Sequence, residues 1–263
     1  MTEANDAAFG GFLNELADAA GSAILPYFRT RLDIEDKGGR GYDPVTAADR
    51  AGEAAMRALI GARFPEHGIL GEEYGRERDD AEHVWVLDPI DGTRSFISGV
   101  PTWGVLIGLM RNGRAVRGMM AQPFTGERYS GDGASARYDG PDGGRSLAVR
   151  ACPDIASATL YATAPDMFTG PDEASFARVS AASRLTRFGA DCYAYCMLAA
   201  GLVDLVVEAK LQPYDIVALV PLIEGAGGIV TTWDGERPEK AGRIVAAGDR
   251  RVHAAALELL NKG

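Results

Sequence analysis

Acidic side chains follow apolar segments of this sequence in a pattern that could hold divalent cations. Glu72 and Glu73 end the segment GILGEE, and Asp88 ends the apolar segment VWVLD. Asp91 follows in the same turn, and Asp215 stands in the C-terminal half. Mg²⁺ takes oxygen ligands and is usually held by a few carboxylates, several waters and a substrate phosphate. The residue types therefore indicate a metal site built from the ends of separate strands.

The residues after Asp91 could bind the phosphate group itself. If Gly92 and Thr93 begin a short helix over GTRSF, their free N–H groups point at the acidic turn. The N-terminus of a helix binds anions through these N–H groups and through its dipole. Acids for metal ions beside donors for phosphate suit the metal-assisted hydrolysis of a phosphate ester.

Each of these residues also has a simpler structural interpretation. An Asp-Gly pair is more often a turn than a site, and Glu72 with Glu73 could belong to a solvated loop. Asp215 before IVALV could be a helix N-cap, and Thr46 with Asp49 has the Thr-x-x-acid pattern of a capping box. Taken one at a time, every residue favours the structural interpretation. The combination favours a site.

The elements that must position these residues are those of a mixed helix and sheet protein. Two segments, WGVLIGLM and AVRGMMAQP, are typical of paired strands, and GDGASARY indicates a hairpin turn because its context lacks the strand and helix of a dinucleotide loop. A loop is expected over residues 36–44. Apolar residues at helical spacing predict helices over residues 5–28, 172–183, 191–201, 215–226 and 249–262, and another after Thr46.

Strands and helices alternate from about residue 151 onward. This alternation predicts a mixed sheet with helical layers in the C-terminal part of the chain. We therefore expect an α+β or α/β sandwich of alternating helix and sheet layers. It would have an N-terminal half over residues 1–150, which carries most of the acids, and a C-terminal half over residues 151–263, which supplies Asp215.

Composition limits the partners. The 263 residues carry a net charge of −10, which argues against nucleic acid or an anionic membrane as the main partner. No apolar run reaches the roughly 18 residues of a membrane span, and the first residues lack the pattern of a signal peptide, so a cytoplasmic protein is expected. Cys152, Cys192 and Cys196 make no paired framework, and the last two are expected to be small buried side chains on one helix face.

In order along the chain, the motifs resemble the signatures of the inositol monophosphatase family. The family's first signature is GEE followed by WxxDPIDGTxxF, here GEE at residues 71–73 and WVLDPIDGTRSF at residues 85–96. Its second is WDxAAxxxIxxEAGG, here YDIVALVPLIEGAGG at residues 214–228. PVTAAD at residues 44–49 matches the upstream metal-loop motif, and the resemblance covers much of the chain from residue 37 to residue 233.

Proteins of this family are Mg²⁺-dependent phosphomonoesterases with alternating helical and sheet layers. The resemblance therefore implies two or three bound Mg²⁺ ions, a small phosphate monoester as substrate and, because related enzymes are mostly dimers, a homodimer. It implies metal ligation by the side chains of Glu72, Asp88, Asp91 and Asp215 and by the carbonyl of Ile90. It also implies that Glu72 and Thr93 orient the attacking water, that Asp49 binds or orients water at a further metal, and that Gly92 and Thr93 hold the phosphate.

The residues after DGT indicate a branch of the family. DGTRSFISGVPTWGVLIGL differs from the sequences of inositol phosphatases and resembles the histidinol-phosphate phosphatase branch, as do RFGADCYAY and QPYDIVALVPLIEGAGG. Tyr214 replaces the usual Trp, and Pro221 and Gly225 depart from the common sequence of the second signature. These departures put inositol specificity in doubt more than catalysis.

Histidinol phosphate carries a cationic amine and an imidazole, so an acidic pocket wall would suit it. Glu208 matches the family's substrate-contacting acid, and Asp191 is a second candidate beside Asp215. Glu208 could instead be a surface acid at a strand end, and Asp191 could be only an N-cap. Arg94 is either a contact on the phosphate side or part of a structural ion pair. The histidines at 67, 83 and 253 are scattered and are expected to be surface or structural residues.

The sequence thus predicts hydrolysis of L-histidinol phosphate to L-histidinol and phosphate in histidine biosynthesis. One alternative keeps the mechanism and takes inositol 1-phosphate or another small phosphomonoester as substrate. A further alternative is a metal-binding module without hydrolysis.

Overall fold

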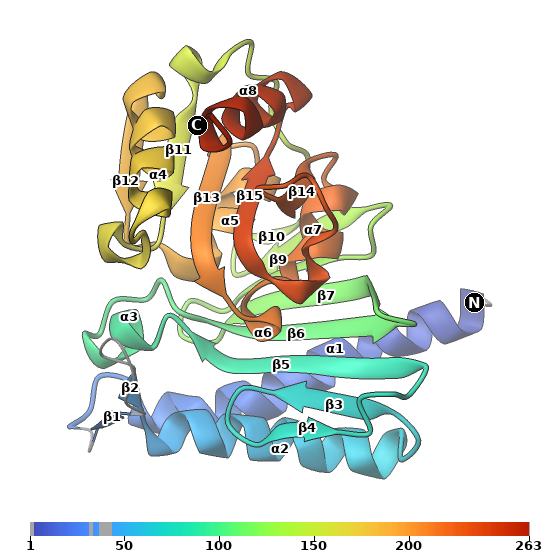
Figure 1. Ribbon diagram of the computed structural model, residues 1–263. Coiled ribbons are helices and arrows are strands. Elements are labelled where there is room, and N and C mark those ends of the chain that lie inside the picture. Colours follow the sequence, from blue (N-terminus) through green and yellow to red (C-terminus); the bar gives the residue numbers. More distant parts are fainter. Residues whose placement is uncertain (1–2, 32–33, 37–43, 263) are drawn as a thin grey trace.

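The computed structural model describes residues 3–31, 34–36 and 44–262 of the chain. Most of the predicted loop over residues 36–44 lies outside them. In the described part of the chain, two large sheets alternate with three layers of helices (Figure 1). The predicted layered α+β sandwich is therefore confirmed. None of the described helices is both long and apolar enough to cross a membrane.

The first sheet carries the acidic motifs. In chain order its strands are β3 (Gly68–Gly71), β4 (Gly75–Glu77), β5 (His83–Asp91), β6 (Gly104–Arg111), β7 (Arg114–Gln122), β8 (Glu127–Gly131), β9 (Ala136–Gly140) and β10 (Gly143–Ser146). Among the described residues they are ordered β10-β9-β8-β7-β6-β5-β3-β4 across the sheet, with β3 parallel to β5. The predicted pairing of WGVLIGLM with AVRGMMAQP is confirmed as the β6–β7 hairpin, and GDGASARY spans the β8–β9 turn.

Two long helices, α1 (Glu3–Ile24) and α2 (Ala47–Arg63), cover one face of this sheet (Figure 1). Phe12 and Leu16 of α1 are buried in the same core as Trp85 of β5. The α-helix ends earlier than the predicted residue 28, and a 3₁₀ turn continues over Leu25–Tyr27. Pro26 explains this ending, because it has no N–H to extend the helical hydrogen bonds.

The start of α2 is a capping box, as predicted. The hydroxyl of Thr46 accepts a hydrogen bond from the N–H of Ala48, while the Asp49 carboxylate accepts one from the N–H of Thr46 at 2.8 Å. Just before it, β1 (Glu35–Asp36) pairs with β2 (Pro44–Val45). The capping fixes where α2 begins, and so fixes which of its residues face β3 and β5.

The second sheet lies beyond the first (Figure 1). It contains β11 (Thr159–Ala162), β12 (Leu185–Phe188), β13 (Leu205–Leu211), β14 (Ile229–Thr232) and β15 (Gly242–Ala247). Its order is β12-β11-β13-β15-β14, with β11 parallel to β12 and β13. Side chains alternate along β13, so Val206 joins the core between the sheets and Val207 joins the outer core.

The middle layer consists of α5 (Asp191–Ala199), α6 (Pro213–Ile216) and α7 (Leu219–Gly225). Its core joins side chains of both sheets, such as Met120 of β7 and Ile244 of β15, to Cys192 and Cys196 of α5. Both cysteines are almost fully buried, as predicted. The helices of this layer thereby pack between one face of the first sheet and one face of the second.

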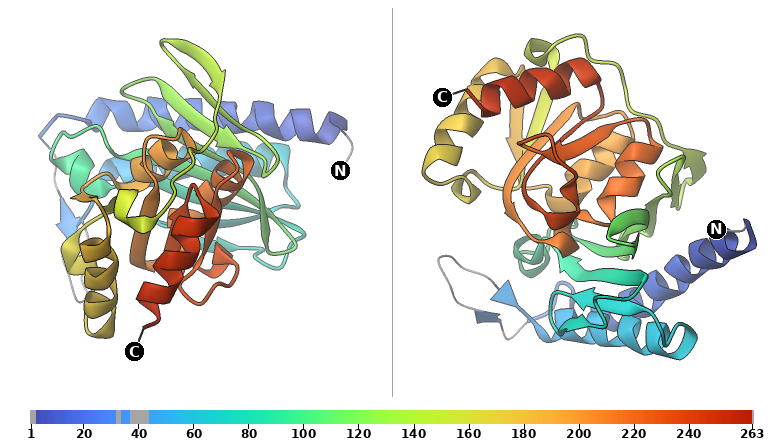
Figure 2. Two further views of the ribbon diagram at one scale, coloured as in Figure 1. Left: turned by 90° about the horizontal axis from the view of Figure 1, so that it is seen from above. Right: turned by 45° about the vertical axis from the view of Figure 1, so that its right-hand side comes forward.

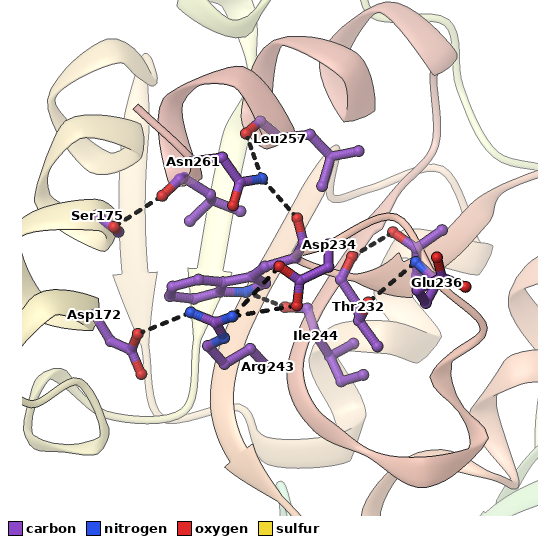
Figure 3. Close-up of polar contacts among 12 residues, drawn as sticks. Asp172, Ser175, Thr232, Asp234, Glu236, Arg243, Ile244, Leu257 and Asn261 are labelled. Carbon is purple, nitrogen blue, oxygen red and sulfur yellow. Dashed lines mark hydrogen bonds and ion pairs between the residues drawn. The ribbon is translucent and has the colours of Figure 1, made fainter. Parts of the chain in front are cut away.

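The outer layer closes the second sheet with α4 (Pro171–Ala182) and α8 (Arg250–Leu260). Figure 3 shows polar contacts of this layer. The Ser175 hydroxyl of α4 donates to the Leu260 carbonyl of α8, and the Asn261 amide donates to the Trp233 carbonyl after β14. Arg243 lies between Asp172 and Asp234. The two views of Figure 2 show α8 far from α1 and α2, on the opposite side of the molecule.

One predicted helix is divided in the structure. The sequence predicts a single helix over residues 215–226, whereas α6 begins at Pro213 and α7 follows after a break at Val217 and Ala218. Pro221 accounts for the break, because it offers no N–H to the carbonyl of Val217 and its ring crowds that carbonyl. The predicted boundary near residue 150 falls between the last strand of the first sheet and the first strand of the second. The division into halves stays a prediction.

Candidate active site

The end of β5 is irregular and aims two carboxylates toward one site. Asp88 pairs with Leu106 of β6, but Asp91 pairs with Gly104, so three steps along β5 match two steps along β6. Residues three apart in a regular strand face opposite sides of the sheet, and the extra residue of this bulge removes that alternation. Pro89 gives no N–H to the ladder, and the Ile90 N–H turns back to Asp88 Oδ1 at 2.9 Å.

Four of the predicted metal ligands lie together. Carboxylate oxygens of Asp88, Asp91 and Asp215 all lie within 4.8 Å of one another. Glu72 shares a hydrogen bond with Asp88. The fifth predicted ligand, the carbonyl of Ile90, accepts a hydrogen bond from the hydroxyl of Thr93 at 3.1 Å. The structure thus gathers residues that are far apart in the sequence.

Asp215 occupies a different helix position from the expected one. Gln212 is the N-cap of α6, and Asp215 is the third residue of its capping box, where it accepts the N–H of Gln212 at 2.7 Å. The N-cap interpretation of Asp215 is therefore wrong. The capping box uses one carboxylate oxygen of Asp215 for the backbone hydrogen bond and leaves the second oxygen for other contacts.

These carboxyl groups resist ionisation in the metal-free protein. Burial, followed by the charges of Glu72, Asp91 and Asp215, raises the pKa of Asp88 well above its ordinary value. Burial and the charge of Asp191 raise the pKa of Asp91 to about 8. Burial, and then the charge of Asp91, raises the pKa of Asp215 as well. Buried like charges repel, so the site holds negative charge at a cost that a cation would offset.

The donor set fits a hard divalent cation. Its atoms are carboxylate and carbonyl oxygens, and the neighbouring charges named above are all acids. Mg²⁺ prefers such oxygen ligands, whereas Zn²⁺ sites are usually built from cysteine and histidine. The acidic cluster could therefore hold metal ions of the Mg²⁺ type.

A short helix follows the acidic turn, as predicted. Gly92 is the N-cap of α3 (Thr93–Ile97) and has a φ of +83°, which favours glycine. A Cβ on Gly92 would also lie 2.9 Å from Asp191 Oδ2. The N–H groups of Gly92 and Thr93 precede the first helical hydrogen bond, which Phe96 donates to the Gly92 carbonyl. They are donors beside the carboxylates.

Asp191 faces this helix from the other half of the chain. It is the first residue of α5 with Ala190 as the N-cap, so the N-cap interpretation of Asp191 is wrong. Its φ is +46°, a conformation that aspartate tolerates better than most residues. The hydroxyl of Ser95 donates to Asp191 Oδ2 at 2.7 Å. Burial raises the pKa of Asp191, although the hydrogen bond from Ser95 and the charge of Arg94 act in the opposite direction.

Glu208 is not the surface acid that its position suggests. It lies within β13, is 2% exposed and shares the face of Val206 that looks toward the middle layer. Its carboxylate accepts hydrogen bonds from the N–H of Thr163 at 2.9 Å and from the hydroxyl of Tyr195 at 2.8 Å. Burial raises the pKa of Glu208 to about 7, although these hydrogen bonds oppose the shift.

Asp91, Asp191, Glu208 and Asp215 line one cavity of about 300 Å³, whereas Glu72 and Asp88 are not among its lining residues. Arg94 lies at its wall and approaches Asp166 with 3.7 Å between Nη1 and Oδ2, but both side chains are more than half exposed. An exposed pair at that distance contributes little to stability. The acids and hydroxyls of the lining outnumber its one arginine: Asp91, Gly92, Thr93, Arg94, Thr163, Ala164, Asp166, Met167, Asp191, Cys192, Tyr195, Glu208, Leu211 and Asp215 line the cavity.

Asp49 is buried at the start of α2, and it does not line that cavity. Its Oδ2 accepts the N–H and the hydroxyl of Thr46, at 2.8 Å and 2.7 Å. This is the structural role that the capping pattern predicts. Its role in binding or orienting water at a further metal stays a prediction.

Several residues of the cavity have no signal in the sequence motifs. Thr163 and Asp166 belong to the segment after β11 and enter the site only through the fold, whereas Tyr195 ends the motif RFGADCYAY without a predicted role. Its position near the end of the apolar segment SATLYATA is the hint that the sequence offers for Thr163. The three histidines lie elsewhere: His253 contacts the Thr231 hydroxyl at 2.9 Å, and His67 accepts a hydrogen bond from Trp85 at 3.1 Å.

Comparison with known proteins places these features in a family. The family model described as "Inositol monophosphatase family" matches residues 8–263. The chain is 44% identical to the bifunctional phosphatase IMPL2, chloroplastic, of Arabidopsis thaliana, over 96% of this chain and 75% of that protein. It is 34% identical to a histidinol-phosphatase of Mycobacterium tuberculosis, over 84% and 85% of the two chains. A solved inositol monophosphatase from Zymomonas mobilis superposes with a TM-score of 0.85 and 41% identity, over 95% and 96% of the chains.

Proposed function

The chain belongs to the inositol monophosphatase family and is a phosphatase, and from this premise we propose that it hydrolyses L-histidinol phosphate to L-histidinol and phosphate. The observation that carries the choice of substrate is the acidic wall of the cavity. Asp191 and Glu208 face the space beyond Asp91, where the group attached to the phosphate would lie. A cationic amine or imidazolium would be attracted there, whereas a neutral polyol would gain only hydrogen bonds.

In the proposed reaction, water attacks phosphorus in line, the ester P–O bond breaks, and the departing alcohol takes up a proton from water. Two or three Mg²⁺ ions, when bound, would lower the pKa of water from 15.7 towards about 7 and stabilise negative charge on the phosphate. The N–H groups of Gly92 and Thr93 would hold phosphate oxygens. The proposed metal ligands are Glu72, Asp88, the Ile90 carbonyl, Asp91 and Asp215.

Two side chains are proposed to orient the attacking water. The Thr93 hydroxyl lies 3.1 Å from the Ile90 carbonyl, so the proton on that hydroxyl is already committed and its oxygen is available to accept one from water. Glu72 would accept the second proton of the same water in a hydrogen bond. This pairing needs no covalent nucleophile. Asp49 is proposed to help orient water at a further metal.

The second candidate substrate is inositol 1-phosphate or another small phosphomonoester. The Zymomonas mobilis structure, described as an inositol monophosphatase, supports it at 41% identity. Glu208 is compatible with both substrates, because a carboxylate also accepts hydrogen bonds from hydroxyl groups. Asp191 discriminates better, since its charge matters most for a cation.

Release of inorganic phosphate from both substrates at one fixed Mg²⁺ concentration tests the proposal. We expect a higher kcat/KM for histidinol phosphate. In Asp191→Asn, which keeps the tolerance for positive φ, the KM for histidinol phosphate should rise about 10-fold or more, while that for inositol 1-phosphate stays within about twofold. Faster hydrolysis of inositol 1-phosphate would favour the second candidate. Metal binding without turnover of any phosphate ester would favour a non-catalytic module.

The biological setting follows from the same proposal. Activity on histidinol phosphate would place the protein in histidine biosynthesis, in the cytoplasm. A homodimer is proposed from the family resemblance alone. Sedimentation equilibrium at micromolar concentration measures the mass directly: about twice the 27.8 kDa of one chain supports the dimer, and a single-chain mass contradicts it.

A further inference from the structure

A buried glutamate on α2 lies beneath the loop that carries Glu72. Glu53 has an acidic side chain with no exposed surface, and it lies outside the cavity described above. Its Oε2 accepts the N–H of Glu73 at 2.7 Å, and its Oε1 accepts the N–H of Tyr74 at 3.2 Å. A carboxylate that is fully buried is costly unless it is paired and hydrogen-bonded, so these contacts need an explanation.

The same carboxylate is braced from its own helix. Arg57, one turn later on α2, donates from Nε to Glu53 Oε1 at 2.7 Å and from Nη2 to the carbonyl of Gly75. Its guanidinium also lies 5.9 Å from the centre of the Tyr74 ring. The pair Glu53–Arg57 therefore clamps the turn between β3 and β4: Glu53 accepts N–H groups of the turn, and Arg57 donates to a carbonyl at its end. The clamp connects the rigid helix to the turn that follows Glu72.

Both peptide groups around Glu72 are consequently fixed. The N–H of Glu72 donates to the carbonyl of Leu87 on β5 at 3.2 Å, and the next N–H, that of Glu73, donates to Glu53. Glu72 itself shares a hydrogen bond with Asp88. The direction in which its side chain leaves the backbone is thus set from β5 on one side and from α2 on the other.

The clamp also explains why residue 71 is a glycine. A Cβ there would lie 1.9 Å from Oε1 and 2.7 Å from Oε2 of Glu53. Gly71 is the last residue of β3, and its backbone conformation is one that any residue could adopt. Glycine is therefore needed here for its small size, which leaves room for the Glu53 carboxylate. The glycine of the GEE segment and the glutamate of α2 form one unit.

From these contacts we infer that Glu53 is a positioning residue, which acts through the Glu73 and Tyr74 N–H groups to hold Glu72 in its place among the metal-binding carboxylates. The inference rests on the proposed function, in which Glu72 is a metal ligand. Partners behind metal ligands typically change metal affinity about 10- to 100-fold when they are lost. Substrate contacts are not involved.

Glu53→Gln is the decisive variant, because all three partners of the carboxylate, from Glu73, Tyr74 and Arg57, are N–H donors. A glutamine amide has one acceptor oxygen, so whichever way it turns, its NH₂ group faces another donor. We expect the loop to shift and the affinity for Mn²⁺, measured from the electron paramagnetic resonance signal of the free ion, to fall about 10- to 100-fold.

Two controls separate positioning from a general loss of stability. Glu15→Gln removes a carboxylate from an exposed ion pair with Arg63 that joins α1 to α2, and should leave Mn²⁺ affinity unchanged. Asp204→Asn disturbs the ion pair of the buried Asp204, just before β13, with the partly exposed Arg150, and should lower the melting temperature without changing Mn²⁺ affinity. If Glu53→Gln does not fold, Gly71→Ala tests the same unit, because its methyl group displaces the carboxylate without removing it. It should weaken Mn²⁺ binding equally.

The outcomes separate this inference from the proposed function. Wild-type Mn²⁺ affinity in Glu53→Gln, or in Gly71→Ala where that variant is used, overturns the inference, provided that Glu72→Gln weakens binding. If Glu72→Gln binds Mn²⁺ as the wild type does, both the metal role of Glu72 and the inference are overturned. A loss of affinity in Glu53→Gln and Glu72→Gln alone among the folded variants supports both.

Discussion

Two aspartates in this molecule are equally buried but differ in their partners and in the direction of their pKa shifts. Asp88 in the acidic site and Asp204 before β13 are each 2% exposed. Burial and the neighbouring acids raise the pKa of Asp88. Burial alone would raise the pKa of Asp204 too, but hydrogen bonds from the Arg150 side chain and the Thr159 N–H hold it below its ordinary value. Burial therefore does not decide the charge state; the partners do.

The difference distinguishes a structural site from a binding site. Asp204 receives a two-pronged contact from Arg150, at 2.7 Å and 2.6 Å, together with the N–H of Thr159 at 2.8 Å. Its charge is satisfied within the protein. Asp88 lies among Glu72, Asp91 and Asp215, which add charge of the same sign. A bound cation would offset the repulsion between these acids, so this site, unlike that of Asp204, could hold a metal ion.

The largest expected effect is on catalysis at the acidic site. Asp91→Asn removes one charge but keeps an oxygen that can accept the N–H of Cys192, which now donates to Asp91 at 2.7 Å. We expect phosphate release to fall by more than about 100-fold, the scale that even outer partners of metal ligands reach. Circular dichroism should show an unchanged fold. Retained turnover would contradict the assignment of Asp91 as a ligand.

Asp204→Asn should have the opposite profile. It breaks a buried ion pair, which costs about 3–5 kcal/mol where both partners are fully buried. Because Arg150 is 40% exposed and can regain water, we expect a loss of about 2 kcal/mol, or roughly 5 °C in melting temperature, with kcat unchanged. A marked fall in kcat without a fall in stability would remove the contrast between the two sites.

The acidic site should also make metal-free stability depend on pH. Its acids have raised pKa values in the folded protein, so the folded state binds more protons than the unfolded chain, and the stability present at low pH is lost as the pH rises through the folded-state values, about 8 for Asp91. From about pH 6.5 to pH 8.5 in EDTA, we expect the melting temperature to fall by roughly 5 °C. Burial lowers the pKa values of His67 and His253 in the folded protein, so these two groups raise stability as the pH rises and oppose the fall.

Millimolar Mg²⁺ should abolish most of that fall, because it binds the ionised carboxylates of the folded state. Asp91→Asn should show a smaller fall in EDTA, since one of the titrating acids is gone. A melting temperature that rises with pH in EDTA would mean that the acids are ionised without a cation. Differential scanning fluorimetry measures all of these conditions on one plate.

The smallest effect is expected at the surface of the second sheet. Asp234 and Arg243 contact each other at 3.2 Å, and Figure 3 shows the Arg243 side chain between Asp234 and Asp172. Their side chains are 61% and 43% exposed, so water screens the pair. Asp234→Asn should change stability by less than about 0.5 kcal/mol and leave activity unaltered. A larger loss of stability, measured by thermal unfolding, would show that solvent exposure does not predict how much this ion pair contributes to stability.

Local sequence patterns predicted most of the elements. The spacing of Phe12 and Leu16 gave α1, the Thr46–Asp49 pattern gave the start of α2, and the segment GTRSF gave α3. The helix over residues 215–226 was predicted as one piece because apolar spacing outweighed Pro221, whose missing N–H breaks it.

The acids of the site were predicted as well, but their surroundings were not. Asp191 and Glu208 had simpler interpretations as an N-cap and a surface acid, and both interpretations are wrong. Nothing local distinguishes a buried strand acid from an exposed one, because burial depends on the sheet and helix packed above it. Glu53 shows the same limit: one glutamate among others on an amphipathic helix becomes special only when β3 lies over it.

By itself, then, the sequence determined which residues could ligate metal and which elements carry them, since motif spacing and periodicity are properties of the chain within a few residues. The tertiary structure alone decided what those residues meet. It set Asp215 beside Asp88 and Asp91 across more than a hundred positions, placed Arg150 beside Asp204 and placed further acids beside Asp88. Charge, burial and hydrogen bonding act over a few ångströms in space, and distance along the chain does not fix them.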